Sequence, residues 1–207
     1  KKNHALIFGI VLSVVSVLGL YYFSNILSAL VLLFTISFYL FVYTIWLKRR
    51  TPQNIVIGGA AGALPPVIGW TIATNSLSLE ALSFFLIIFF WTPSHFWALS
   101  LYKVADYKKA KIPMLPVTNG IEETKKNIFV YSLLMLPTLA LPYIIGFVGE
   151  LFLFSTFGLT IYYILLCFAL LKAKKNSFDL QKAKRVFGYS ILYLFLIFVL
   201  FLVDKLF

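Results

Sequence analysis

Three short stretches of the 207-residue sequence carry side chains that could do chemistry. In the first, residues 48–54 (KRRTPQN), three cations precede a hydroxyl and a proline. Guanidinium and ammonium groups bind phosphate oxygens, and the free N–H groups of a helix start strengthen that attraction. We therefore expect Lys48, Arg49 and Arg50 to bind a phosphate or diphosphate, with Thr51 capping the next helix. The alternative is that the cations only mark the cytoplasmic end of a membrane helix.

The second stretch, residues 91–102 (WTPSHFWALSLY), places one histidine among aromatic residues. Ionisable residues inside membrane spans are candidates for function, and an imidazole can bind a metalloporphyrin or hydrogen-bond a polar substrate. His95 is therefore a candidate ligand; alternatively, it lies near the interface and bonds to a helix carbonyl. Trp91 and Trp97 fit either a pocket wall or the belt of interfacial aromatic residues.

The third stretch, residues 106–120 (DYKKAKIPMLPVTNG), combines a single carboxylate with lysines and prolines in the longest polar loop. Mg²⁺ in proteins is often held by one or two carboxylates together with substrate phosphates. Asp106 is thus a candidate Mg²⁺ ligand, although it could also serve only to balance the neighbouring lysines.

The composition indicates where these stretches must lie. The chain is 61% hydrophobic and 12% charged, whereas soluble domains average roughly 25% charged residues. This excludes secreted, nucleic-acid-binding and ordinary cytosolic proteins and indicates an integral membrane protein. The single cysteine, Cys167, excludes a disulfide framework.

Uncharged runs between the charge clusters predict an all-α membrane bundle with seven spans. A turn at residues 24–25 divides the first, 45-residue run. With seven spans, 17 of the 18 lysines and arginines share one side, which carries a net charge of +13 against −2 opposite. The basic side is cytoplasmic by the positive-inside rule, and no nucleic-acid partner is needed to explain the charge. The spans are predicted near residues 6–24, 27–47, 54–73, 80–101, 127–148, 151–171 and 186–203.

The third span has small residues and a proline pair. Gly58, Gly59 and Gly62 predict a face on which a neighbouring helix packs closely. Pro65 and Pro66 predict a break in the helix, which membranes tolerate where the gap faces protein or a cavity.

Together these stretches resemble the UbiA superfamily of intramembrane prenyltransferases. Residues 48–51 match a pattern of the whole superfamily, whereas residues 58–70, 91–99 and 106–117 resemble the branch that farnesylates haem b. The resemblance implies transfer of a farnesyl group from farnesyl diphosphate to a vinyl group of haem b, giving haem O, with Mg²⁺ as cofactor. It implies catalytic roles for Lys48, Arg49 and Asp106, with Asp106 on the metal, and substrate-binding roles for Arg50, Thr51, Asn54, His95, Trp91, Tyr102 and Lys103.

The resemblance also implies how the chain is organised. Residues 1–207 would form a single domain holding the last seven of nine helices, without the first two helices and their Asp-rich loop, and would be inactive alone. The implied location is a bacterial inner membrane with the polar loops in the cytoplasm, where haem A synthase or terminal oxidase assembly are candidate partners. Two alternatives stay open: a related prenyltransferase acting on an aromatic quinone precursor, and a non-enzymatic haem or lipid carrier.

Overall fold

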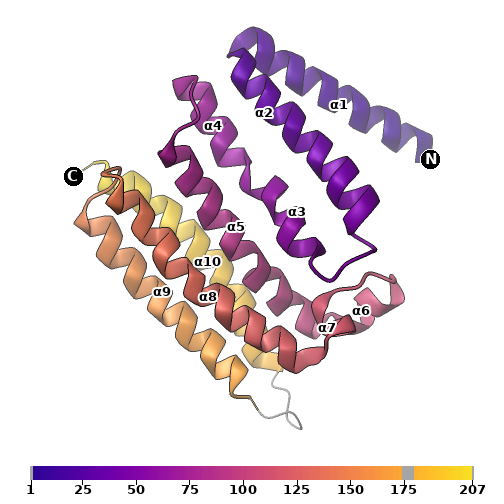
Figure 1. The fold of residues 1–207 in the computed structure, drawn as a ribbon, viewed down its shortest axis with the longest axis vertical. Helices are drawn as coiled ribbons and strands as arrows, with labels where there is room; N and C mark the ends of the chain where they lie inside the picture. Colours follow the sequence, from indigo (N-terminus) through magenta and orange to yellow (C-terminus); the bar gives the residue numbers. More distant parts are fainter. Residues whose placement is uncertain (1, 174–179, 207) are drawn as a thin grey trace.

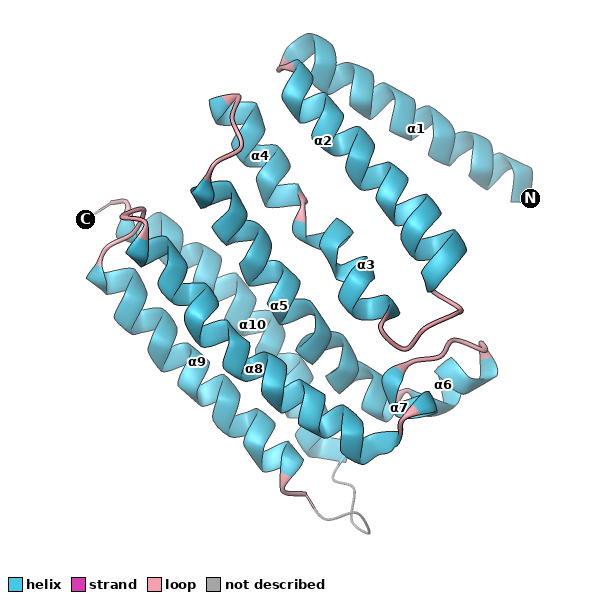
Figure 2. Cartoon of the chain, in the orientation of Figure 1, coloured by secondary structure: helices cyan, strands magenta, loops and turns pink. Residues whose placement is uncertain are grey.

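The structure, a computed structural model, describes residues 2–173 and 180–206. These residues form helices joined by turns (Figures 1 and 2). Seven helical segments among them are long and apolar enough to cross a membrane, which confirms the predicted all-α bundle with seven spans. The lysines at positions 174 and 175, which the charge count places on the basic side of the membrane, lie outside the described residues. The helices are α1 (Lys2–Phe23), α2 (Ile26–Ser37), η1 (Phe38–Leu47), α3 (Asn54–Ala63), α4 (Pro65–Thr74), α5 (Leu79–Tyr102), α6 (Val104–Lys109), α7 (Leu115–Thr118), α8 (Gly120–Ile144), α9 (Glu150–Leu171) and α10 (Leu180–Asp204).

The first two spans form a hairpin that turns at the predicted place. Asn25 caps α2, because its side-chain oxygen accepts a hydrogen bond from the Ser28 N–H at 2.8 Å. Its side-chain N–H donates to the Thr71 carbonyl at 2.8 Å, which ties the hairpin to α4. Figure 1 shows α1 on the outer side of α2, at the edge of the bundle.

Two irregular segments shape the middle of the bundle. The second span changes from α2 into the wider turns of η1, where the Lys48 N–H donates to the Tyr43 carbonyl five residues earlier. The third span is interrupted at Leu64, so that Pro65 begins the separate helix α4. The predicted break at the proline pair is therefore confirmed.

Several predicted boundaries are wrong because charge alone defined the spans: α1 begins at Lys2 and α10 at Leu180, four and six residues before the predicted starts. Helix α8 begins at Gly120, seven residues before the predicted start, since Lys125 is fully buried and donates to Glu122 at 2.9 Å and to the Ala173 carbonyl at 2.8 Å. It ends at Ile144, four residues early, where Gly146 takes a φ of 71°.

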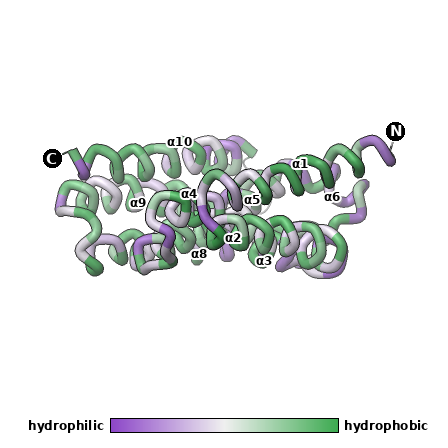
Figure 3. Tube along the Cα trace, turned by 90° about the horizontal axis from the view of Figure 1, so that it is seen from above, coloured by the Kyte–Doolittle hydropathy of each residue, from purple (hydrophilic) through white to green (hydrophobic). Residues whose placement is uncertain are grey.

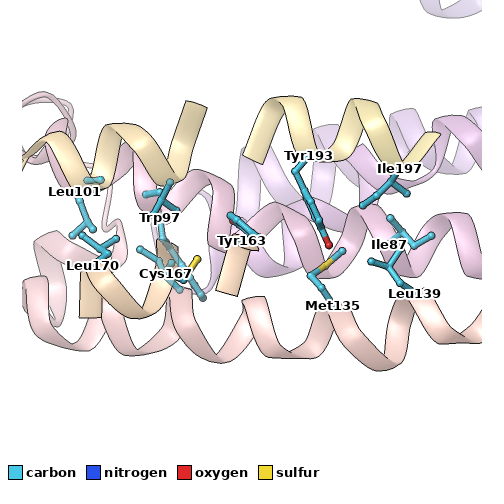
Figure 4. Close-up of a cluster of buried hydrophobic side chains, with 14 of the residues drawn as sticks. Ile87, Trp97, Leu101, Met135, Leu139, Tyr163, Cys167, Leu170, Tyr193 and Ile197 are labelled. Atoms are coloured by element: carbon cyan, nitrogen blue, oxygen red, sulfur yellow. The ribbon is translucent and has the colours of Figure 1, made fainter. Parts of the chain in front are cut away.

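Helix α5 lies at the centre and packs against α3, α8 and α10, while α9 packs against α8 and α10. Their buried side chains form one core, in which Figure 4 shows Trp97 beside Cys167 and Met135 beside Tyr193. Figure 3 shows apolar residues along the helices, with many polar residues near the ends. The central helix α5 thus carries the histidine motif.

Candidate functional site

A cavity of about 470 Å³ lies between η1, α3 and α5. Tyr39 and Tyr43 line it from η1, and Trp91, Thr92 and His95 line it from α5. The histidine motif thus faces an open volume inside the membrane-spanning bundle.

The glycines of α3 hold the cavity wall close to its neighbours. A Cβ on Gly58 would lie 2.3 Å from Cδ2 of Tyr43, and one on Gly59 would lie 3.0 Å from Cγ2 of Thr92. The close-packing prediction is confirmed at these two positions. Gly62 differs, because a Cβ there would meet no atom of the described residues within 4 Å and would project into open space.

His95 is held from three sides. Its ring stacks on Trp91 at 4.2 Å between centroids and on Phe187 of α10 at 4.6 Å. Its Nδ1 lies 2.6 Å from the Ser190 hydroxyl, also on α10. The alternative in which His95 bonds to a helix carbonyl is therefore wrong.

The two tryptophans of the motif have different environments. Trp91 lines the cavity, and its Nε1–H donates to the Ser190 carbonyl at 2.9 Å. Trp97 is fully buried in the core and packs edge-on against Tyr131, so it belongs neither to a pocket wall nor to an interfacial belt. Trp91 alone of the pair contributes to the cavity.

The basic turn between η1 and α3 lies beside α6 at one end of the bundle (Figure 1). Lys48 holds its ammonium 5.8 Å from the centre of the Tyr43 ring, within the range of a cation–π contact. Arg49 and Arg50 are exposed, and neither forms an ion pair with any residue that the structure describes. Both guanidinium groups are thus accessible to an anion.

The predicted helix cap at Thr51 is wrong by two residues, because Gln53 occupies the cap position of α3. Helix α3 begins at Asn54, and the Thr51 hydroxyl instead accepts from the Gln53 N–H at 3.2 Å. Asn54 is fully buried, and its side-chain N–H donates to the Thr51 carbonyl at 2.7 Å. The buried side-chain oxygen of Asn54 has no hydrogen-bond partner among the described residues. Asn54 therefore fixes the shape of the basic turn and retains one unused acceptor.

The acidic position lies on α6. Asp106 forms an ion pair with Lys103 at 3.2 Å, and both side chains are exposed. Within the described ranges, no group of three or more histidine, cysteine or acidic residues could hold a metal ion. The single carboxylate of Asp106 could hold Mg²⁺ only if substrate phosphates supplied further oxygen ligands. The ion pair between Asp106 and Lys103 would also have to open.

Two tyrosines lie near the acidic position: Tyr102 is the last residue of α5, and Tyr107 lies on α6. Burial, and then the Asp106 carboxylate, raise the pKa of Tyr107 above its usual value near 10, so its hydroxyl stays a donor. Tyr102 packs edge-on against Phe187 at 6.0 Å, and Phe187 stacks on His95. Phe187 therefore links Tyr102, at the end of α5, to His95 on the cavity wall.

Sequence reasoning missed Ser190 and Phe187, which lie almost a hundred residues after His95. A serine within an otherwise apolar span was the available signal, but nothing in a single sequence pairs it with a particular helix.

Comparison with known proteins gives three findings. The sequence profile of the UbiA prenyltransferase family matches residues 1–192. A protein of Pelagibacter ubique (strain HTCC1062) is 74% identical over 99% of this chain and 68% of its own length, and one of Parvibaculum lavamentivorans is 52% identical over 98% and 64%. Both are named protoheme IX farnesyltransferase, and this chain spans about two thirds of their length. A solved structure described as digeranylgeranylglyceryl phosphate synthase superposes with a TM-score of 0.80 at 19% identity, covering 99% of this chain and 70% of that one, which shows a shared fold.

Proposed function

The chain belongs to the UbiA prenyltransferase family, and we propose that its protein farnesylates haem b to make haem O. The observation that carries this proposal is a histidine, clamped between two aromatic rings, on the wall of a cavity within the membrane bundle. The names of the relatives at 74% and 52% identity support the same reaction. In it, C1 of farnesyl bonds to the terminal vinyl carbon while the C1–O bond breaks and its electron pair leaves with diphosphate. Water adds to the other vinyl carbon and releases a proton.

The basic turn is the proposed diphosphate site. Arg49 and Arg50 present exposed guanidinium groups, and Lys48 lies over the ring of Tyr43, which lines the cavity. Positive charge at the leaving group favours ionisation of the allylic bond, because it stabilises the charge that develops on diphosphate. Lys48, Arg49 and Arg50 thus both bind the donor and lower the barrier.

Asp106 is the proposed contact for Mg²⁺, which would neutralise diphosphate charge. Asp106 forms an ion pair with Lys103. Once that pair opens, the Lys103 ammonium would bind the diphosphate. Thr51 and Asn54 hold the basic turn in place, and Tyr102 packs between that end and the aromatic clamp. Together with the basic turn, these residues complete the proposed diphosphate and Mg²⁺ site.

His95 and Trp91 are the proposed acceptor side of the site. A planar aromatic wall and an imidazole suit a porphyrin and its iron. A second cavity of about 640 Å³, lined mainly by apolar residues of α1, α2, η1 and α3, shares Tyr39 and Gly62 with the first. We assign the farnesyl chain to this apolar volume, so that its reactive end lies near the shared wall.

The proposed setting is the bacterial inner membrane, with the basic end in the cytoplasm. One-sided polarity suits an enzyme that takes haem from the bilayer and diphosphate ester from water. Haem A synthase and the terminal oxidase assembly are proposed as recipients of the product. We also propose that residues 1–207 are part of one larger UbiA-type domain whose preceding helices and Asp-rich loop are needed for activity.

Product analysis tests the reaction. The full-length protein, purified in detergent, would be given labelled farnesyl diphosphate with either haem b or 4-hydroxybenzoate, and products separated by mass. We expect label in a haem whose former vinyl group has become a hydroxyethylfarnesyl group, and none on the benzoate. Label on the benzoate would indicate a quinone-precursor prenyltransferase, and haem binding without any product would indicate a carrier; either result would overturn the proposal.

A further inference from the structure

Helix α10 makes a set of polar contacts with the histidine motif that the reaction alone does not explain. The Ser190 hydroxyl lies 2.6 Å from Nδ1 of His95, and the Ser190 carbonyl accepts the Trp91 Nε1–H at 2.9 Å. One residue of α10 thus contacts two of the cavity-lining rings of α5, Trp91 and His95.

The direction of the His95 contact follows from counting hydrogens. The Ser190 hydroxyl has a single hydrogen, and it donates that hydrogen to the Phe187 carbonyl at 2.6 Å. The Ser190 oxygen must then act as acceptor toward His95. Nδ1 of His95 therefore carries the proton, and in the neutral ring Nε2 retains its lone pair.

Stacking fixes the remaining freedom of the ring. The ring of Trp91 lies nearly parallel to that of His95, with an interplanar angle of 19°. The ring of Phe187, on α10, also lies nearly parallel to it, at 24°. The two rings set the plane of the imidazole, and Ser190 sets its rotation within that plane. Nε2 forms no hydrogen bond with any described residue, and His95 lines the cavity, so the Nε2 edge is the one left to face it.

We propose that Ser190 is a positioning residue that holds His95 as the Nδ1–H tautomer and presents Nε2 to the iron of haem b. This rests on the proposed function, because it takes haem b to be what the cavity binds. Histidines that ligate metals typically donate their other ring N–H to a fixed acceptor, and loss of that acceptor weakens metal binding about 10–100-fold.

The test compares Ser190→Ala with Ser190→Thr, which keeps a hydroxyl, in the full-length protein. Ser83→Ala is the matched control, because Ser83 is also fully buried and also donates to a carbonyl three residues earlier, yet lies outside the site. Haem b titration followed by absorption and resonance Raman spectra would report affinity and the iron–imidazole band. We expect at least tenfold weaker binding and an altered band in Ser190→Ala, with wild-type behaviour in the other two variants.

A second measurement does not depend on haem and reads the wild-type protein, with a variant used only to assign the signals. The ¹⁵N resonances of the His95 ring in the haem-free wild-type protein, assigned by their loss in His95→Ala, report which nitrogen carries the proton. A protonated Nε2, or an unchanged haem spectrum in Ser190→Ala, would overturn the role of Ser190 even if the protein makes haem O. Failure of the proposed function would look different: no farnesylated haem from wild-type protein.

Discussion

Replacement of Gly58 by alanine tests whether the wall of the cavity is as tightly packed as the structure indicates. The added Cβ would lie 2.3 Å from Cδ2, 2.6 Å from Cε2 and 2.9 Å from Cγ of Tyr43. Ordinary contact begins near 3.4 Å, so the Tyr43 ring must move by about 1 Å. Overpacking of this kind typically costs about 1–3 kcal/mol.

Alanine is also favoured over glycine in a helix by about 1 kcal/mol, which offsets part of that cost. Gly62→Ala on the same helix gains this preference without a clash, because nothing lies within 4 Å of its Cβ. We therefore expect Gly58→Ala to be less stable than Gly62→Ala by about 1–3 kcal/mol, the steric cost alone.

Unfolding of the full-length protein by SDS in mixed micelles, followed by circular dichroism, would measure the difference. The double variant Gly58→Ala with Tyr43→Ala supplies the internal check, since removal of the ring abolishes the clash and couples the two substitutions. Equal stability of the two alanine variants, together with additive effects in the double variant, would refute the close approach of Tyr43 to α3.

Three further predictions concern charged residues. Arg49→Ala should raise the KM for farnesyl diphosphate at least tenfold in steady-state assays, because an exposed guanidinium that contacts diphosphate is lost. Asp106→Asn should raise the Mg²⁺ concentration needed for half-maximal rate, and Lys103→Ala should not, because only the carboxylate is a metal ligand. Lys125→Met should lower the free energy of unfolding by about 1–3 kcal/mol, since the Ala173 carbonyl loses its donor inside the protein.

Matched controls keep these outcomes distinct. Lys126→Ala is the control for Arg49→Ala: it removes an exposed cation that pairs with Glu123, so it should leave the KM for farnesyl diphosphate unchanged. If both variants raised the KM equally, Arg49 would contribute only through the general positive charge of the surface. If the Mg²⁺ response of Asp106→Asn matches wild type, the aspartate only balances Lys103. Undiminished stability of Lys125→Met would show that water satisfies the carbonyl.

The sequence predicts the number of spans and their order because both follow from charge and length. It places the turn at Asn25 and the break at Pro65 because these residue types leave few alternatives to the backbone. It misplaces the start of α8, since a charge count cannot show that Lys125 is neutralised by Glu122 and a distant carbonyl.

The site is predictable only where chemistry and local sequence coincide. His95 and Trp91 follow from their motif, and the structure places both on one cavity. Trp97 looks equivalent to Trp91 in the sequence. It follows His95 by two residues, however, so the helix turns its side chain to a different face, where it is buried in the core. Ser190 depends on which helix packs against α5, and that is decided by the whole fold.

Filling the shared wall of the two cavities tests most directly whether haem b binds there. Gly62 lines both cavities and has open space in front of its Cβ, so Gly62→Phe should fold and occupy the volume assigned to the substrates. Gly158→Phe is the control, because Gly158 on α9 is exposed and likewise has nothing within 4 Å. In haem b titrations of the full-length protein, we expect the Kd of Gly62→Phe to rise at least tenfold and that of Gly158→Phe to match wild type. Wild-type affinity in a folded Gly62→Phe variant would contradict the assignment of this cavity to haem.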